Sequence, residues 1–150
     1  MTLQVYNSGM VKTRFYKKSD YPQVKAILQE ANLFDKVWDG EENLAGMIDN
    51  DKQSILVAEV NNKITGNIFI TPYGPKVAYL FRLAVKQEFR QQGVATKLLT
   101  EAETICKKRG VKEIALFADK DNQFLNDFYY KRNYKTSSVL HAYYCFWKQL

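Results

Sequence analysis

The chain has 150 residues, of which 46% are hydrophobic and 14% aromatic, and it carries a formal net charge of +6. This length and composition predict one folded globular domain and exclude a disordered chain. No apolar run approaches the roughly 20 residues of a membrane-spanning helix, and no hydrophobic stretch follows a basic end at the N-terminus. We therefore expect a cytoplasmic protein that has no membrane partner.

The distribution of basic residues and the small number of potential metal ligands bear on whether the protein binds nucleic acid or a metal. The basic residues are scattered and form no recognition motif, so no nucleic-acid partner is expected. Cys106 and Cys145 lie in apolar segments and are expected to be reduced core residues. The single histidine, His141, is expected to be structural or at the surface. These residues form no cluster with metal-ligand spacing, so no metal is expected.

The first third of the chain predicts a tail, a strand and two helices. Residues 1–10 are expected to form the tail, and residues 11–150 a single domain. A short strand is expected at 13–16. Ser19-Asp20 is typical of a helix cap, and apolar residues recur at helical spacing after it. A second helix is expected over 40–49.

The middle of the chain predicts a three-stranded meander. Its strands are expected at 54–60, 63–71 and 77–85. Asn61 and Asn62 tolerate positive φ, so they predict a hairpin turn between the first two strands. The third strand of this meander is the fourth strand of the chain.

The last third predicts a helix, a strand, a helix and two closing strands. The first helix is expected over 96–109, where Gly110 ends it, and the strand over 113–118. A helix joins this strand to the one before it, which predicts a parallel pair in an α+β domain. The loop and helix over 119–132 are expected to turn Phe124, Leu125, Phe128 and Tyr129 inward, and residues 134 and 139–147 to form the closing strands.

The segment from Leu83 to Thr96 predicts a phosphate site. A strand ends in a short turn, and a helix follows at once. The first amides of a helix point outward, and the helix dipole adds partial positive charge there. Gly93 lets an anion approach the backbone, and Arg90 and Lys97 add full charges. A helix start with a small residue is the plain structural alternative.

Two motifs in order resemble the GNAT superfamily of acetyl-CoA-dependent N-acetyltransferases, in its small single-domain bacterial form. The first is an apolar strand end at Leu83–Val85 followed by Arg90-Gln-Gln-Gly-Val-Ala95. The second is Asn122, followed by Phe128-Tyr129 and then Asn133-Tyr134. Asn133 replaces the usual glycine of the family and is the next best residue at positive φ.

The resemblance implies a three-layer α/β/α fold whose central mixed sheet is splayed between the fourth and fifth strands. The pantetheine arm of acetyl-CoA would pair with the fourth strand in that gap, and the turn and helix start would hold the pyrophosphate. The residues that the resemblance assigns to acetyl-CoA are Leu83, Ala84, Val85, Arg90, Gln91, Gln92, Gly93, Val94, Ala95, Thr96 and Asn122.

The resemblance also implies a catalytic acid, but it leaves the base open. Tyr129 would protonate the leaving thiolate. Some members place a carboxylate where this chain has Tyr79, and others where it has Phe117. The base is therefore Glu41, Glu42, Asp35, a water chain or none. The residues expected to line the acceptor side are Phe34, Trp38, Glu41, Glu42 and Tyr79.

Two functions remain open from the sequence. The first is transfer of an acetyl group to a primary amine, either a small amine or the lysine or N-terminal amine of a peptide. The acidic stretch from Asp35 to Asp51 favours a cationic acceptor. The alternative is a non-catalytic module that binds or senses CoA or acyl-CoA. Many members of the family are dimers, which allows a homodimer here.

Overall fold

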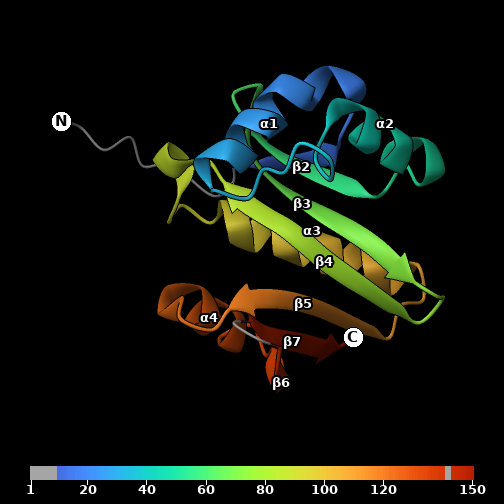
Figure 1. Cartoon of the computed structure of the whole chain (residues 1–150), viewed down its shortest axis with the longest axis vertical. Helices are drawn as coiled ribbons and strands as arrows, with labels where there is room; N and C mark the ends of the chain where they lie inside the picture. The colour runs from blue at the N-terminus through green and yellow to red at the C-terminus, as the bar shows by residue number, and fades with distance from the viewer. Residues whose placement is uncertain (1–9, 141–142) are drawn as a thin grey trace. The chain divides into compact units, whose positions relative to one another are not determined.

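The computed structural model describes residues 10–140 and 143–150 and divides the chain into two compact units (Figure 1). The first unit contains the chain up to Ile70 and Arg82–Ala102, and the second contains Thr71–Phe81 and Glu103–Leu150. Most of the predicted tail, and His141, lie outside the described residues.

The described residues form a seven-stranded mixed sheet with four α-helices, which confirms the predicted α+β class. The strand order is β1-β2-β3-β4-β5-β7-β6. The strands are β1 (Lys12–Phe15), β2 (Ile55–Val60), β3 (Lys63–Tyr73), β4 (Val77–Val85), β5 (Glu113–Asp119), β6 (Lys135–Leu140) and β7 (Tyr143–Gln149). The helices are α1 (Tyr21–Glu30), α2 (Glu41–Asn50), α3 (Val94–Lys108) and α4 (Gln123–Tyr130), with short 3-10 turns η2 (Lys18–Asp20) and η3 (Gln87–Phe89).

In the first unit, β3 is buried along most of its length. Residues 64–70 of this strand are all buried, which requires cover on both faces of the sheet. Figure 1 shows α3 crossing behind β3 and β4, whereas α1 and α2 lie on the side away from it. The predicted turn at Asn61 and Asn62 is confirmed, with φ of 51° and 63°.

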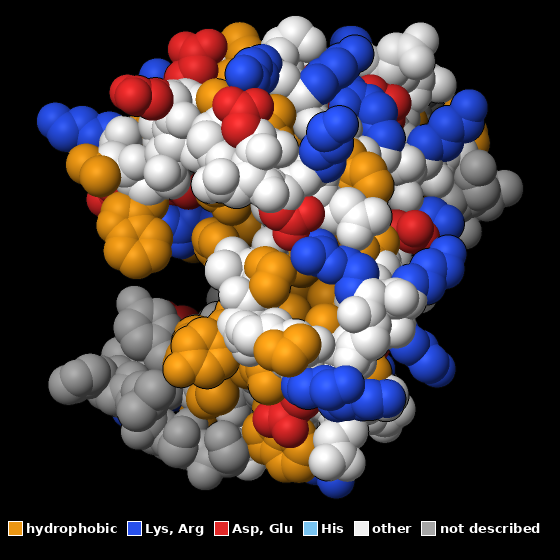
Figure 2. Space-filling view, turned by 90° about the vertical axis from the view of Figure 1, so that its right-hand side faces the viewer, with side chains coloured by type: hydrophobic (Ala, Val, Ile, Leu, Met, Phe, Trp, Pro, Cys, Tyr) orange, Lys and Arg blue, Asp and Glu red, His pale blue; other side chains and the backbone are white. Residues whose placement is uncertain are grey.

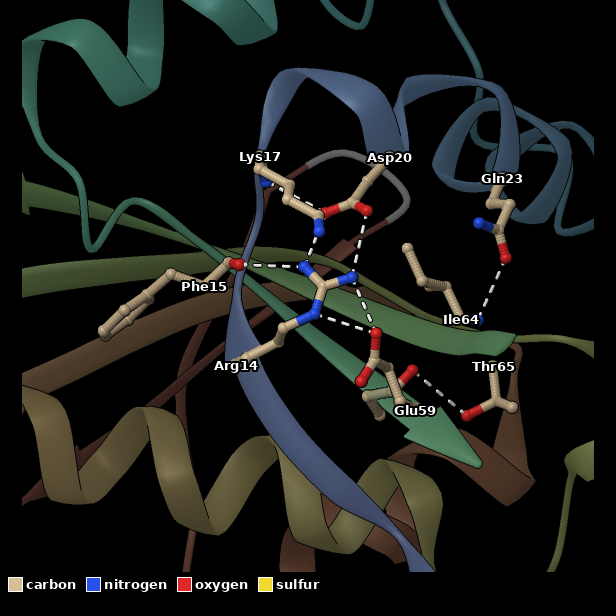
Figure 3. Close-up of polar contacts among 9 residues, drawn as sticks. Arg14, Phe15, Lys17, Asp20, Gln23, Glu59, Ile64 and Thr65 are labelled. Atoms are coloured by element: carbon tan, nitrogen blue, oxygen red, sulfur yellow. Dashed lines mark hydrogen bonds and ion pairs between the residues drawn. The ribbon is translucent and has the colours of Figure 1, made fainter. Parts of the chain in front are cut away.

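Asp20 occupies the N-cap position of α1, as predicted, but its carboxylate binds other groups. Asp20 precedes α1 but makes no side-chain cap bond to that helix. Instead, its two carboxylate oxygens accept hydrogen bonds from the Arg14 guanidinium at 2.7 and 3.0 Å, and the Lys17 amide donates at 2.9 Å (Figure 3). Arg14 also donates to Glu59 at 2.8 Å, so one guanidinium joins β1, η2 and β2.

In the second unit, β5 lies between a parallel and an antiparallel neighbour. It pairs with β4 over Val77–Tyr79 in parallel, as predicted, and with β7 along its whole length in antiparallel register. Gly110 and Asn133 both adopt positive φ, at 83° and 66°, where the chain leaves α3 and α4. The positive φ predicted for Asn133 is confirmed.

Aromatic packing forms the core of the second unit. The Tyr129 ring lies 5.6 Å from that of Tyr134 and 5.3 Å from that of Phe146, measured between centroids. The prediction that Phe124 faces inward is wrong: its side chain is exposed, and the buried residues of α4 are Asn126 and Tyr129. Phe124 lies in the first turn of this short helix, on the side away from Tyr129.

Charged side chains of both signs lie on the face that Figure 2 draws. Figure 2 shows Lys and Arg spread over the face that it draws, with Asp and Glu among them. Among the described residues, no helix combines the length and apolar character needed to cross a membrane. In the same part of the chain, no group of three or more His, Cys, Asp and Glu side chains could hold a metal ion. Cys106 and Cys145 are free thiols.

Candidate active site

The end of β4 carries the first group of predicted cofactor residues. The parallel pairing of β4 with β5 reaches Tyr79, whereas β4 itself continues to Val85. Leu83 is half-buried, and Ala84 and Val85 are buried. The strand end is held in place by the Lys86 amide, which donates to the carbonyl oxygen of Thr65 in β3 at 2.8 Å.

The turn between β4 and α3 exposes backbone amides in front of a helix end. Gln91 and Gly93 adopt φ of 60° and 84°, and alternating handedness of this kind directs successive N–H groups to one side. Lys97 N donates to Gly93 O at 2.9 Å at the start of α3, and the first amides of a helix have no carbonyl one turn earlier in the helix to bind. The first turn of α3 contains no acidic residue that would compete for these groups. The predicted phosphate cradle therefore has the chemistry of an anion site.

Side chains of the turn support its backbone. Arg90 Nε donates to the carbonyl oxygen of Val85 at 2.9 Å, and Gln92 Nε2 donates to that of Glu88 at 3.1 Å. Phe89 is buried beneath the turn. Arg90 therefore ties the turn back to the end of β4 as well as adding positive charge beside it.

Gly66, which the sequence motifs do not include, lies beside the predicted site. A Cβ atom at this position in β3 would lie 2.9 Å from the Ala84 carbonyl oxygen, 3.0 Å from Leu98 Cδ1 and 3.1 Å from Val94 Cγ1. The first turns of α3 thus lie against the strand where a side chain would otherwise stand. A glycine within a strand rich in β-branched residues was the available sequence signal, since it is typical of a close backbone approach.

Asn122 is the N-cap of α4 in the second unit. Its Oδ1 accepts a hydrogen bond from the Leu125 amide at 3.0 Å, and the side chain is exposed. This cap uses the oxygen and leaves the Nδ2 donor available. Asn126, one turn further along α4, is buried and donates through Nδ2 to the Lys120 carbonyl oxygen at 3.0 Å, which fixes the loop before the helix.

Tyr129 is the buried tyrosine of α4, with 5% of its surface exposed. Burial raises the pKa of its hydroxyl well above the ordinary value, so the phenol stays protonated at neutral pH. The neighbouring Tyr130 has a different environment: it is exposed, and its hydroxyl lies 3.4 Å from Thr136 Oγ1.

The predicted acceptor residues of the first unit lie between α1 and the start of α2. Trp38 is 68% exposed, and Phe34 is half-buried with Lys25 Nζ 5.4 Å from its ring centre. Glu41 and Glu42 are exposed in the first turn of α2. Asp35 is a weak candidate base, because hydrogen bonds from the amides of Trp38 and Val37 lower the pKa of its carboxyl group.

The acidic stretch is less available than its sequence suggests. Asp39 is buried and paired with Arg82, and Asp49 lies 3.4 Å from Lys18. Glu41 and Glu42 remain exposed acids close to Trp38 along the chain, as does Asp35.

Tyr79 and Phe117 lie together in the second unit. Their rings are stacked with centroids 6.0 Å apart and planes 8° apart, and Tyr73 meets Tyr79 edge-on at 5.9 Å. Phe117 and Tyr73 are exposed. The two positions that the resemblance associates with a carboxylate in relatives therefore form one aromatic surface.

The structure brings the predicted site residues together in two groups. The first unit holds the end of β4, the turn and the start of α3, together with Phe34, Trp38, Glu41 and Glu42. The second unit holds Asn122, Tyr129 and Tyr79.

Comparison with known proteins identifies the family. The model of the acetyltransferase (GNAT) family matches residues 13–134. An acetyltransferase of Pectobacterium atrosepticum is 27% identical over 126 residues, which are 84% of this chain and 89% of that protein. Because the family model matches most of the chain, the chain belongs to the GNAT family of acetyl-CoA-dependent acetyltransferases.

Solved structures share the fold. PaiA N-acetyltransferase from Thermoplasma acidophilum, in complex with coenzyme A, has a TM-score of 0.83 at 22% identity, covering 93% of this chain and 99% of that chain. Ard1 from Thermoplasma volcanium has a TM-score of 0.83 at 19% identity, covering 94% of this chain and 98% of that chain.

Proposed function

We propose that this chain transfers the acetyl group of acetyl-CoA to a primary amine, carried by a small molecule or by the lysine or N-terminus of a peptide. The observation that carries the proposal is the turn before α3, where Gln91 and Gly93 adopt positive φ in front of a helix end without acids. Such a backbone suits a pyrophosphate. The PaiA neighbour was solved with coenzyme A, which supports the same ligand here. The proposed catalytic domain spans residues 11–150.

Residues of each unit have a part in this proposal. The amides of residues 91–96 would bind the pyrophosphate, and backbone groups of Leu83 and Val85 would pair with the pantetheine arm. The Val85 amide would stabilise the negative charge that develops on the acetyl oxygen. Asn122 would donate from Nδ2 to the pantetheine arm, because its Oδ1 accepts from the Leu125 amide.

The reaction breaks one bond and forms one. The amine nitrogen attacks the thioester carbonyl carbon, the carbon–sulfur bond breaks, and the sulfur leaves with the bonding electron pair. The Tyr129 hydroxyl would donate its proton to this sulfur and recover a proton from solvent, while the amine releases one. The Tyr129 phenol is protonated across the neutral range, as its ordinary pKa already ensures, and burial moves the pKa further upward.

Replacing Tyr129 with phenylalanine tests the proposal. The probes are n-butylamine, an N-terminally blocked peptide with one lysine, and a lysine-free peptide with a free N-terminus, with acetylated product measured by mass spectrometry. We expect Y129F to lower kcat by about 100-fold while the Kd for CoA, measured by calorimetry, stays within about twofold, because only transfer needs the hydroxyl. The exposed neighbour provides the control variant Y130F, which should retain activity.

Two outcomes would contradict the proposal. If the wild type binds CoA but acetylates none of the three probes, a non-catalytic CoA-binding module becomes the better description. If Y129F retains the wild-type kcat, the assignment of Tyr129 is wrong and the rest of the proposal stands.

A further inference from the structure

Arg82 has an unusual backbone conformation immediately before the proposed donor segment. It lies within β4 and directly precedes Leu83, yet its φ is +55°. This left-handed region is unfavourable for a residue with a long side chain, and it persists where the surrounding structure imposes it. The contacts that hold Arg82 at positive φ therefore indicate the role of this conformation.

Two buried groups from different elements hold Arg82. Asn67 of β3, which is fully buried, donates from Nδ2 to the Arg82 carbonyl oxygen at 2.8 Å. Asp39 accepts hydrogen bonds from Arg82 Nε at both carboxylate oxygens, at 3.0 and 3.2 Å, and is 1% exposed. The main chain and the side chain of Arg82 are thus fixed separately.

Asp39 also organises the loop that joins α1 to α2. Its Oδ2 accepts from the Asp35 amide at 2.8 Å, and its own amide donates to the Asp35 carbonyl oxygen at 2.8 Å. The Asp35 carboxylate in turn accepts from the amides of Val37 and Trp38, at 2.8 and 3.0 Å. The loop is therefore a closed turn, and the Asp39 carboxylate binds both this turn and β4.

We propose that the Asp39–Arg82 ion pair is a positioning latch that couples the acceptor loop to the donor strand. This inference rests on the proposed function. One carboxylate fixes the turn that carries Trp38, and it also fixes the backbone direction from which β4 enters Leu83–Val85. Asp39 and Arg82 act through these two segments, and neither needs to touch the substrates.

The Arg14 network provides a matched comparison within the same unit. Arg14 also pairs with two carboxylates, those of Asp20 and Glu59, at 2.7 Å each (Figure 3). These partners join β1, η2 and β2, none of which carries a proposed substrate residue. Replacing an arginine with a purely structural role should therefore affect kcat/KM as little as replacing Arg14 does. Replacing a positioning residue should lower kcat/KM.

The experiment compares D39N, R82Q and R82K with R14Q. The amine is whichever of the three probes the wild type acetylates fastest, and kcat and KM are measured for the amine and for acetyl-CoA. We expect D39N and R82Q to lower kcat/KM for the amine by about 10- to 100-fold, and to lower kcat/KM for acetyl-CoA as well, because the latch also holds the backbone of Leu83–Val85. R82K, which keeps the charge, should recover part of the loss. R14Q should keep kcat/KM for the amine and for acetyl-CoA within about twofold of the wild-type values, even where its melting temperature falls.

Hydrogen exchange gives a readout that does not depend on turnover. Amides 35–39 should exchange about tenfold faster in D39N than in the wild type, and at the wild-type rate in R14Q. If D39N does not fold, R82Q and R82K carry the same test.

The latch is overturned if the wild type acetylates the amine and both D39N and R82Q keep its kcat/KM. It is also overturned if R14Q lowers kcat/KM for the amine as much as they do. If the wild type acetylates no probe, the proposed function fails and the latch, as a device of that function, fails with it.

Discussion

Gly66 illustrates how one residue without a side chain can place a helix. Its missing Cβ is the space in which Val94 and Leu98 meet β3, so α3 begins close to the end of β4. This closeness places the outward amides of the helix beside the strand that precedes the turn. A residue far from the motif in sequence therefore determines where the motif's helix begins.

Replacing Gly66 with alanine should destabilise the protein. The new Cβ would meet the Ala84 carbonyl oxygen at 2.9 Å, a backbone atom that cannot move aside independently. We expect a loss of about 1–3 kcal/mol in the free energy of unfolding, measured by denaturant titration, and weaker CoA binding because the helix start shifts.

Gly46 provides the matched control. It lies inside α2, and an added Cβ would meet no atom within 4 Å. G46A should raise the free energy of unfolding by about 0.5–1 kcal/mol, since alanine is the better helix former. A G66A variant as stable as the wild type would contradict the assigned role.

At the scale of elements, α4 begins at a residue with two separable tasks. The Oδ1 atom of Asn122 caps the helix through the Leu125 amide, and the proposed ligand contact belongs to Nδ2. A carboxylate could replace the first group but not the second. The two tasks can therefore be distinguished by two substitutions at one position.

We expect N122A and N122D to differ in stability but not in their effect on binding. N122A loses the cap and should lower the free energy of unfolding by about 1 kcal/mol, whereas N122D retains a capping oxygen and should stay near the wild type. Both should weaken CoA binding in calorimetry. Wild-type affinity in N122D would show that the Nδ2 donor makes no ligand contact.

Local sequence patterns predicted the positions of helices and strands better than they predicted which side chains contact one another. Apolar spacing and turn residues placed the helices and strands, and Asn133 was correctly assigned positive φ because of its side chain. The start of α3 was predicted at Thr96 and lies at Val94, since a β-branched valine after a glycine gives a weak helix signal. Asp20 was assigned to the nearest helix, whereas its partner Arg14 lies on a neighbouring strand.

The missed parts of the candidate site share one physical cause. Asp39 and Arg82 are 43 positions apart, and Gly66 meets residues of a helix that begins well after it. Such contacts depend on which elements pack together, and a single sequence does not specify that directly. The motif itself could be predicted because its strand, turn and helix are contiguous.

For the molecule as a whole, buried ionisable groups predict a loss of stability at alkaline pH. Burial raises the pKa of the Cys106 thiol from 9.0 to about 11, and it also raises the pKa values of Tyr129 and Tyr134. In each case the unfolded chain ionises first. The stabilisation is therefore complete below the unfolded pKa and is lost as the pH rises through the folded value.

For Cys106 the affected window is pH 9 to 11. The free energy of unfolding should fall there by about 1.4 kcal/mol per pH unit from this thiol alone. Denaturant titrations at several pH values should show a correspondingly shallower fall in C106A. The wild type and C106A should follow parallel curves between pH 7 and 8, and equal slopes above pH 9 would contradict the prediction.

The short parallel pairing of β4 with β5 has a consequence for synthesis on the ribosome. Val77–Tyr79 can acquire their partners only after Glu113–Ala115 have been made. Until then this segment of β4 is an open strand edge on a nascent chain, where it is able to pair with other chains. The second unit is also discontinuous, because residues 82–102 interrupt it. Chaperone dependence should therefore be greatest for chains that stop within α3, before β5 emerges.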